Sequence, residues 1–565
     1  MNRWSITLIG VLFTVACAAP GAPVAGTGDS ATVSTMQDTQ TALKVPTSPP
    51  KYGGMMVVPS PEGPKTMNPY FSNGVVMSHV GRPLFDNLVE EYQPALDYED
   101  RGGSRVEPML AERWEMPNET TMLFHLRRGV KFHNDDTLDA DDVVYSLEFA
   151  RDAKNNFPAR ASYRSVDKID KVDQFTVRMT LRERDVQFLR RLTSADSYIL
   201  SKEFLEGGGD PNKTPVGTGP FRQAKFDPNV EAIAVKFDGY WQKGKPYLDA
   251  HRVPFGLDRS AILAAFATKK IDSYNVTDKI QFTEFQRQVP DLKYYVYHGG
   301  YNYGWYPNVS RPPLSDVRVR RAMQLGIDRQ AVNESVMFGA GLIEQPGSAS
   351  GSLKEAGIPY NDLIKMPGWR QPKDQDVAEA KRLLQEAGYP NGLKLRGSYI
   401  STFTTVPQIA EVTATQLKKV GIDVELIPME ASLWFDAVQN KGDFDITIGS
   451  SFIGPNPDRK LSDFWYSKGP YNKSGISDPK LDELIIRAKS IEDDAERRKV
   501  YAEASRILMD QAYYMSTADT AYFGIVQPWV YNLYGNFAAQ SQLRKPGEVW
   551  MDTEKMPQDR LKAPR

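Results

Sequence analysis

The residues best able to perform acid–base or metal chemistry are few in this chain and lie far apart. It has 565 residues but only five histidines and a single cysteine, Cys17. The histidines lack the short spacings of metal ligands; they are His79, His125, His133, His251 and His298. The sequence also lacks the G-x-S-x-G and H-E-x-x-H patterns of hydrolases. We therefore expect no catalytic residue, no cofactor and no metal site.

Two clusters of charged residues could be read as ion sites. The acidic cluster at 135–142 lacks the glycine and the closing glutamate of a calcium-binding loop, so its charges are better explained by the start of a helix. The second cluster is basic and consists of Arg318, Arg320, Arg321 and Arg329. It could bind an anion, but ion pairs across the surface of a large lobe are the simpler prediction.

The stretch 109–151 must position the acidic cluster, and its pattern predicts a hairpin followed by a helix. Two short apolar segments, 114–116 and 121–126, flank a turn that contains Pro117 and Asn118. Asp139 then precedes Asp142 by three positions, ahead of an apolar run, which is typical of a capped helix start. Farther on, segments 166–172 and 175–181 alternate apolar and polar residues and predict two antiparallel strands.

A Gly/Pro-rich stretch at 214–221 resembles a phosphate-binding loop only superficially. No Lys-Ser/Thr pair follows its glycines, and the next segments, 221–226 and 231–237, have the pattern of strands. We predict a tight turn whose glycines have positive φ.

The second half of the chain alternates predicted strands with predicted helices. The strands are expected at 393–400, 423–428 and 444–450, and the helices at 319–327, 377–387, 408–420, 433–440, 481–488 and 495–508. Gly388 follows the second helix as a C′ glycine. This alternation predicts a parallel or mixed sheet covered by helices.

Composition and length narrow the classes of protein. Hydrophobic residues make up 41% and charged residues 25%, as in a soluble globular protein, and 565 residues are too many for one core. The 69 basic residues balance 71 acidic ones, for a net charge of −2. That balance argues against a nucleic-acid partner, because phosphate binding needs a basic surface.

The N-terminus predicts export. Arg3 precedes an apolar run that is too short to span a bilayer, which is typical of a signal peptide over residues 1–16. Cys17 follows Val15-Ala16 in an arrangement that resembles a bacterial lipobox, although Thr14 stands where leucine is usual. Residues 17–52 then form a tether rich in Ala, Pro, Gly, Ser and Thr. We expect a protein of the cell envelope, periplasmic or extracellular, anchored by lipid at Cys17; ordinary signal cleavage is the alternative.

Several spaced motifs together resemble the peptide/nickel-type solute-binding proteins of ABC importers, known as solute-binding protein family 5. They occur in the family's order from about residue 53 to residue 530. The motifs are 111–114, 126–133, 140–143, 215–221, 239–241, 246–249, 264–272, 316–322, 327–329, 442–445, 481–484 and 496–498.

The resemblance implies an α/β fold of two lobes with mixed sheets, a ligand cleft between the lobes and an extra small α+β domain. We expect lobe I to comprise 53–75, 198–297 and 515–565, the extra domain 76–197, and lobe II 298–514. It also implies a monomer without enzymatic activity that delivers a small organic solute or peptide to the permease subunits of an ABC transporter.

Two aromatic or polar stretches are the best candidates for solute contacts, because ligand pockets combine aromatic area with a few polar groups. The run at 301–306 holds four aromatic residues and one amide, where the family's chain passes between lobes, and 450–458 follows a predicted strand. The alternatives are a buried core strand and an ordinary loop. The candidates are Tyr301, Tyr303, Trp305, Ser450, Phe452, Asn456 and Asp458, with Trp434, Asn68 and Tyr274 as weaker ones.

The loop 450–458 departs from the peptide-binding members of the family. They place an aspartate before an acidic-Pro pair to hold the peptide's ammonium group, whereas this chain has Ile453 and Asn456, with Asp458 beyond. Asp458 or Glu430 would have to supply that charge. Sugars, opines and metal chelates therefore stay open as ligands. A solute sensor, an envelope chaperone-like protein or a secreted hydrolase with distant triad residues are the alternative functions.

Overall fold

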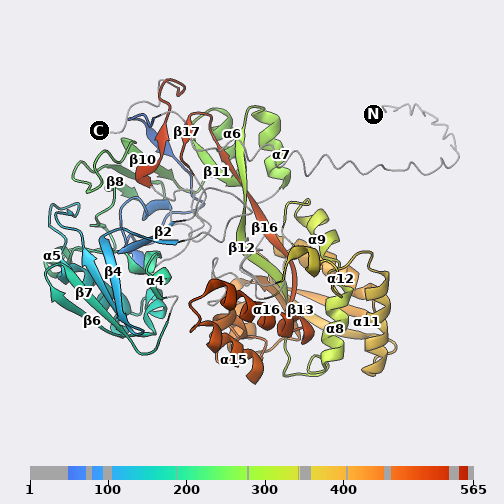
Figure 1. Ribbon diagram of the computed structural model, residues 1–565. Coiled ribbons are helices and arrows are strands. Elements are labelled where there is room, and N and C mark those ends of the chain that lie inside the picture. Colours follow the sequence, from blue (N-terminus) through green and yellow to red (C-terminus); the bar gives the residue numbers. More distant parts are fainter. Residues whose placement is uncertain are drawn as a thin grey trace, which may run out of the picture.

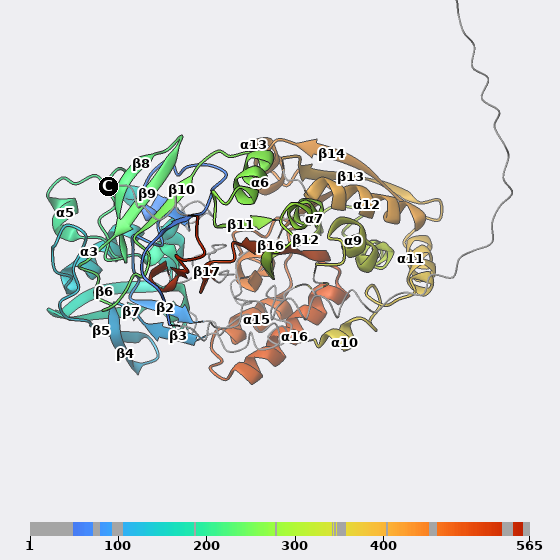
Figure 2. The same cartoon turned by 90° about the horizontal axis from the view of Figure 1, so that it is seen from above.

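The computed structural model describes residues 49–71, 79–92, 105–185, 188–276, 279–341, 343, 346, 358–402, 405–450, 460–533 and 546–557. Figures 1 and 2 show two bodies connected by two long strands, β12 (Lys293–Pro307) and β16 (Met515–Val526). The first body carries the sheets from the first half of the chain, and the second carries α8 to α16. This is the predicted bilobal α/β fold with mixed sheets. Within the described residues, no helix has the length and hydropathy needed to cross a membrane.

Two four-stranded sheets build most of the first body. One has the order β1-β10-β9-β8 and is antiparallel except for the parallel pair β1 and β10; the other has the antiparallel order β4-β5-β7-β6. Their limits are β1 (Met55–Val57), β4 (Ala111–Asn118), β5 (Thr121–Leu126), β6 (Val166–Asp173), β7 (Thr176–Leu181), β8 (Phe221–Asp227), β9 (Glu231–Lys236) and β10 (Ala250–Pro254). A smaller pair joins β2 (Val89–Tyr92) to β3 (Arg105–Pro108).

The predicted hairpin and helix start are confirmed. Strands β4 and β5 pair until Asn118 faces Thr121, so the turn is shorter than the four residues expected. Helix α3 (Ala140–Arg151) follows Asp139, whose carboxylate accepts from the N–H of residue 141, while the Asp142 carboxylate accepts from the N–H of Asp139 at 2.9 Å. This reciprocal capping satisfies N–H groups that a helix N-terminus leaves unpaired.

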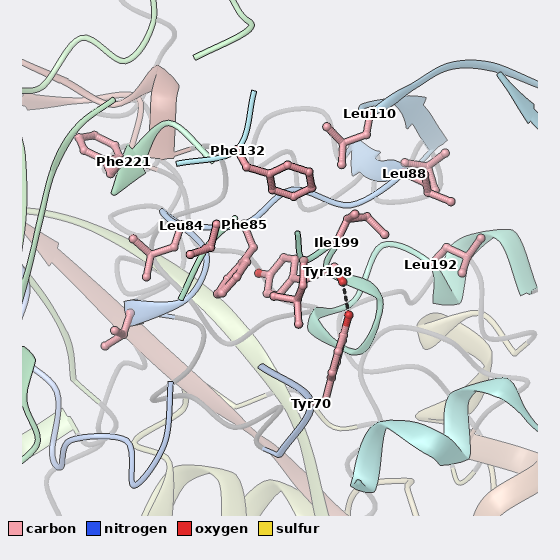
Figure 3. Packing of buried hydrophobic residues seen from close by; sticks show 14 of the residues in the cluster. Tyr70, Leu84, Phe85, Leu88, Leu110, Phe132, Leu192, Tyr198, Ile199 and Phe221 are labelled. Atoms are coloured by element: carbon pink, nitrogen blue, oxygen red, sulfur yellow. Dashed lines mark hydrogen bonds between the residues drawn. The ribbon is translucent and has the colours of Figure 1, made fainter. Parts of the chain in front are cut away.

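One hydrophobic core extends through both four-stranded sheets, and Figure 3 shows part of it. The rings of Phe85 and Tyr198 stack with their centroids 5.3 Å apart. The Tyr70 hydroxyl donates to the Tyr198 carbonyl at 2.5 Å, which satisfies the one polar group that this ring carries into the core. Because the core is continuous, the sheet at β4 to β7 is fixed firmly to the sheet at β8 to β10.

The Gly/Pro-rich turn at 214–221 is tight, but for a reason other than the predicted one. Neither Gly217 nor Gly219 has positive φ, so that expectation was wrong. Both glycines instead lie against the backbone of residues 84 and 85: a Cβ at Gly217 would be 2.2 Å from the Leu84 carbonyl oxygen, and one at Gly219 would be 2.5 Å from the Leu84 carbonyl carbon. Glycine is required there because backbone packs on backbone.

A six-stranded sheet with the order β11-β16-β12-β15-β13-β14 spans both bodies. Its limits besides β12 and β16 are β11 (Ser273–Val276), β13 (Leu393–Ile400), β14 (Ile422–Met429) and β15 (Ile446–Ser450). Strands β13, β14 and β15 are parallel, whereas β12 is antiparallel to β15 and β16. The prediction of a mixed sheet is confirmed, while the predicted limits of the lobes and of the extra domain stay predictions.

Helices cover both faces of this sheet in the second body, and the alternation of β12 divides its residues between the two cores. Trp305 packs into the core with α8, α9, α11 and α12, whereas Tyr306 packs into the core with α15 and α16. The helices of the second body are α8 (Val317–Gly326), α9 (Arg329–Val336), α10 (Tyr360–Leu363), α11 (Asp374–Glu386), α12 (Thr405–Lys419), α13 (Ala431–Trp434), α15 (Pro479–Ala488) and α16 (Asp494–Asp510). Helices α6 (Arg259–Ala267) and α7 (Lys279–Gln288) lie beside β11 at the other end of the sheet. Segments η7 (Phe435–Asn440) and η8 (Leu461–Trp465) are π-helical.

The basic cluster on α8 and α9 forms fewer ion pairs than predicted. Arg318 pairs with Asp316 at 2.6 Å. Arg320 and Arg321 instead donate to backbone carbonyls at the C-terminal end of α16, where the helix leaves carbonyl oxygens without partners. Arg329 is buried and binds carbonyl oxygens as well. These arginines therefore hold neighbouring elements together.

Candidate functional site

Strand β12 changes partners as it passes from one body to the other. Residues 293–298 pair with the second half of β16, and register shifts follow around Asn302. Residues 303–307 then also pair with β15, where Ser450 lies opposite Tyr303. Tyr295 belongs to the core of the first body and Trp305 to a core of the second. Strand β15 therefore ends where the chain crosses between the bodies.

The carboxyl ends of three parallel strands meet at this crossing. Ile400 at the end of β13 lies opposite Met429 at the end of β14, and β13 pairs in parallel with β15, which ends at Ser450. Ligands of α/β proteins characteristically bind outside the carboxyl ends of parallel strands. We therefore take this edge of the six-stranded sheet as the candidate functional site.

Trp434 is fixed at this edge by hydrogen bonds through two strands. Helix α13 begins directly after β14, so its tryptophan lies near the strand ends. The Trp434 indole N–H donates to the Thr447 hydroxyl at 2.8 Å, and that hydroxyl donates to the Ser398 carbonyl at 3.0 Å. Trp434 is buried, and its ring is held in one orientation.

Lys473 places its ammonium group among three aromatic rings at the same edge. Its Nζ lies 4.0 Å from the ring centroid of Tyr306, 5.3 Å from that of Trp434 and 5.5 Å from that of Phe464. A Cβ added to Gly449 would lie 4.0 Å from this Nζ, so the backbone of Gly449 lies directly beside the ammonium group. Burial lowers the pKa of Lys473 to about 7, because desolvation disfavours the charged form. We call Lys473, Tyr306, Trp434 and Phe464 the lysine cage.

The aromatic run that the sequence singled out is divided by the pleat of β12. Trp305 is fully buried, and its indole N–H donates to Thr413 at 2.9 Å, so the residue is placed as part of the core and offers no accessible surface to a solute. Tyr303 is half-buried beside that core, opposite the half-exposed Ser450. Tyr301 lies on the same strand. Tyr303 and Ser450 are the predicted contacts that the structure brings to the edge with Trp434.

The remaining predicted contacts lie elsewhere or outside the described residues. Asn68 is buried in the first body, where its side chain accepts from the Tyr70 N–H at 3.1 Å and shapes a turn. Tyr274 lies on β11 and packs beside Phe285 with a centroid distance of 6.3 Å. Phe452, Asn456 and Asp458 lie outside the described residues, as does Cys17.

Glu430, one of the two carboxylates predicted to hold a solute ammonium, already serves α13. It is the N-cap residue of that helix and accepts from the Ser432 N–H at 2.8 Å. Bonds from Ser432 lower the pKa of Glu430, which is exposed. A cap of this kind leaves the carboxylate ionised, so Glu430 keeps a negative charge close to Trp434.

Sequence reasoning missed Lys473 and Gly449. Lys473 lies in a loop, within Tyr471-Asn472-Lys473-Ser474, where a single lysine carries no spacing signal. Its role depends on Tyr306, Trp434 and Phe464, which come from three separate segments of the chain. Only the pairing of β12 with β15 brings these segments together, and sequence periodicity does not specify which strands become neighbours.

The histidines described by the structure are placed as structural groups. His133 contacts the Gly219 carbonyl through Nε2 at 3.0 Å, and burial lowers its pKa to about 4. Burial also lowers the pKa of His79 to about 4 and that of His251 to about 3. Among the described residues, no group of three or more His, Cys, Asp or Glu side chains could hold a metal ion.

An ion pair connects the two bodies at their surface. Arg184 follows β7 in the first body, and Glu492 lies between α15 and α16 in the second. The Arg184 guanidinium binds the Glu492 carboxylate and, at 2.9 Å, that of Glu119 in the β4–β5 turn. The bodies therefore interact through side chains as well as through the strands that cross between them.

Comparisons with known proteins agree with this architecture. Heme-binding protein A of Haemophilus influenzae is 30% identical over 468 residues, which are 76% of this chain and 82% of that protein. The dipeptide-binding protein of Escherichia coli is 27% identical over 498 residues, 82% of this chain and 88% of that protein. The structure of DppA from Helicobacter pylori in complex with the peptide STSA has a TM-score of 0.71 at 23% identity and covers 89% of this chain and 99% of that one.

The family match covers most of the chain. The description "Bacterial extracellular solute-binding proteins, family 5 Middle" matches residues 105–473. This range includes the whole sheet of β4 to β7, strands β8 to β10 of the other four-stranded sheet, helices α8 to α13 of the second body and all members of the lysine cage. The match agrees with the order of motifs in the sequence and with the bilobal fold. The chain therefore belongs to family 5 of the bacterial extracellular solute-binding proteins.

Proposed function

We propose that this protein is the extracytoplasmic receptor of an ABC importer, and that it captures a peptide or a similar small organic solute and delivers it to the membrane permease. The observation that carries the proposal is the position of the candidate site, at the carboxyl ends of β13, β14 and β15 where β12 crosses between the bodies. The similarity to dipeptide-binding proteins supports peptides as the solute class. The protein has no catalytic activity of its own.

Solute capture works through the two strands that connect the bodies. Each body keeps its own core, so the bodies move as units. The backbone dihedral angles of β12 and β16 change to allow this motion, near the register shifts at residues 298–304. A solute that contacts both bodies binds the closed arrangement more tightly, and this difference in affinity shifts the equilibrium toward closure. The permease then recognises the closed form.

The N-terminal segment keeps the receptor at the membrane. Signal cleavage exposes Cys17, whose acylation supplies the anchor, and residues 18–52 provide the distance between the lipid and the folded body. The folded body acts as a monomer outside the cytoplasm. Mass spectrometry of the native protein, with a Cys17→Ser variant as control, tests the lipid by its added mass.

The solute class is tested by native mass spectrometry of protein purified from its own source, followed by calorimetric titration with peptides of two to five residues. We expect one peptide per chain. Binding of sugars, opines, heme or nickel chelates with no binding of any peptide would overturn the peptide assignment.

The location of the site is tested by steric block. Ser450→Trp places a large ring at the end of β15, so we expect peptide binding to be lost. Ser477→Trp makes the same change in an exposed loop outside the candidate site and serves as the matched control. Equal binding by both variants would place the solute elsewhere.

A further inference from the structure

Lys473 has an unusual environment for a half-buried lysine. The three rings of the lysine cage lie around its ammonium at 4.0–5.5 Å. In the part of the chain that the structure describes, no carboxylate pairs with this ammonium and no oxygen accepts a hydrogen bond from it. Three N–H donors are therefore left without an acceptor.

Aromatic rings compensate only part of the cost of burying such a group. The face of a ring attracts a cation, but it does not replace the hydrogen bonds that water gives to an ammonium. Ordinary buried cations have oxygen partners, because an unpaired charge in the interior is strongly destabilising. The lysine cage thus holds a cation in place while leaving its donors free.

The position of the cage adds a second, independent observation. Tyr306 lies on β12 and Gly449 on β15, one residue before that strand ends at the crossing between the bodies. Gly449 leaves open the space beside Nζ that a side chain would fill. The unpartnered ammonium therefore lies at the edge where the parallel strands end and where the proposed function places the solute.

We propose that Lys473 is a contact for an anionic group of the solute, and that this group is a carboxylate. The inference rests on the proposed function and narrows its substrate class to peptides or small organic acids with a carboxylate that reaches the cage. The carboxylate accepts charge-assisted hydrogen bonds from Nζ, while Tyr306 and Trp434 line the approach with aromatic surface.

The titration of Lys473 gives the proposal a distinct signature. The charged or titratable groups on the elements packed around it are Tyr306 on β12, Glu430 and Asp436 around α13, and Asp463 on η8, but burial alone shifts its pKa to about 7. A bound carboxylate favours the charged form and raises that pKa. Binding near pH 8 should therefore take up a proton, which calorimetry detects as a dependence of the binding heat on the buffer.

The test compares a dipeptide with its C-terminal amide on the full mature chain. Wild-type protein should bind the free acid at least about tenfold more tightly, because the amide lacks the charge. Lys473→Met should bind both forms equally, at the level of the amide, and should lose the proton uptake. Lys473→Arg should restore part of the preference. Lys468→Met, a change in a nearby exposed loop, is the matched control and should behave as wild type.

A second pair of ligands identifies the source of the carboxylate. Two dipeptide amides that differ only by Glu in place of Gln test a carboxylate in the solute's side chain, because only the Glu form is charged. Tighter binding of the Glu form by wild-type protein, lost in Lys473→Met, supports the proposal and identifies the side chain as the anionic group. If Lys473→Met folds, binds peptide and discriminates as wild type in both pairs, the inference is overturned while the proposed function stands. If wild-type protein binds no peptide or organic acid at all, the inference and the peptide assignment of the proposed function are both overturned.

Discussion

Arg329 and Lys473 both lie against aromatic rings, Arg329 buried and Lys473 half-buried, and they differ in what surrounds the charge. Arg329 lies 4.0 Å from the ring centroid of Trp369, and its Nη1 donates to three backbone carbonyls, that of Gly368 at 2.6 Å. Lys473 lies at the same distance from Tyr306 but lacks oxygen partners among the described residues. Ring contact alone therefore does not distinguish a structural cation from a binding one. The two side chains differ in their hydrogen-bond acceptors: Nη1 of Arg329 has three while its Nε and Nη2 have none, and Nζ of Lys473 has none among the described residues.

The largest effect is expected at Arg329. Arg329→Met would remove this donor from the Gln324 and Ile327 carbonyls and leave the Gly368 carbonyl with Lys373 alone, so we expect a loss of about 3 kcal/mol in the free energy of unfolding. Urea unfolding followed by tryptophan fluorescence measures it. Arg321→Met, which removes a single bond from an exposed arginine, is the control and should cost much less. A loss at Arg329 no larger than at Arg321 would remove the distinction between Arg329 and Lys473.

Lys473→Met should change stability less, and in the opposite direction. Methionine fills the lysine cage with an apolar chain that interacts well with rings, and the burial cost of the ammonium disappears. We expect the free energy of unfolding of the solute-free protein to rise by about 1 kcal/mol at pH 7. A loss of stability similar to that of Arg329→Met would show that Lys473 is a structural cation as well.

The stability difference at Lys473 should also depend on pH. Its pKa is about 7 in the fold against an ordinary value of 10.5, so between these values the unfolded chain binds the additional proton. The contribution of Lys473 to the stability of the wild-type protein therefore becomes less unfavourable as pH rises across this window, and the advantage of Lys473→Met shrinks toward pH 10. Unfolding midpoints of both proteins at pH 7, 8.5 and 10 measure the effect. A constant difference would mean that the ammonium is solvated in the folded state.

Sequence patterns predicted the local structure of this protein well. The strand at 393–400 was predicted to the residue, and the cap at Asp139 and the C′ glycine at Gly388, with φ of +91°, were confirmed. These features are set by neighbouring residues through hydrophobic periodicity, capping and φ preference. The spaced motifs added the family and, through it, the bilobal fold.

The candidate site was harder to predict because strand neighbours define it. The run at 301–306 was selected for its aromatic content, yet the pleat of β12 directs Trp305 into a core and Tyr306 into the lysine cage. Which core each face of β12 meets follows from its pairing with β15 and β16, a contact across more than a hundred residues. Lys473 has no local pattern at all, so only the assembled sheet reveals it.

Arg184 is a third cation, half-buried and paired across the two bodies, and removing its partner should have the smallest effect. Glu492→Gln removes the partner in the second body but leaves Glu119, so we expect solute affinity to fall only about twofold at low ionic strength, because solvent weakens exposed ion pairs. Salt at 0.5 M should abolish the difference, since screening acts on such charges first. Glu483→Gln, an exposed change on α15, is the matched control. A tenfold loss of solute affinity, or a loss that salt does not change, would mean that this ion pair stabilises the closed arrangement as strongly as a buried contact. The expected order of effects, from Arg329 through Lys473 to Arg184, would then be wrong.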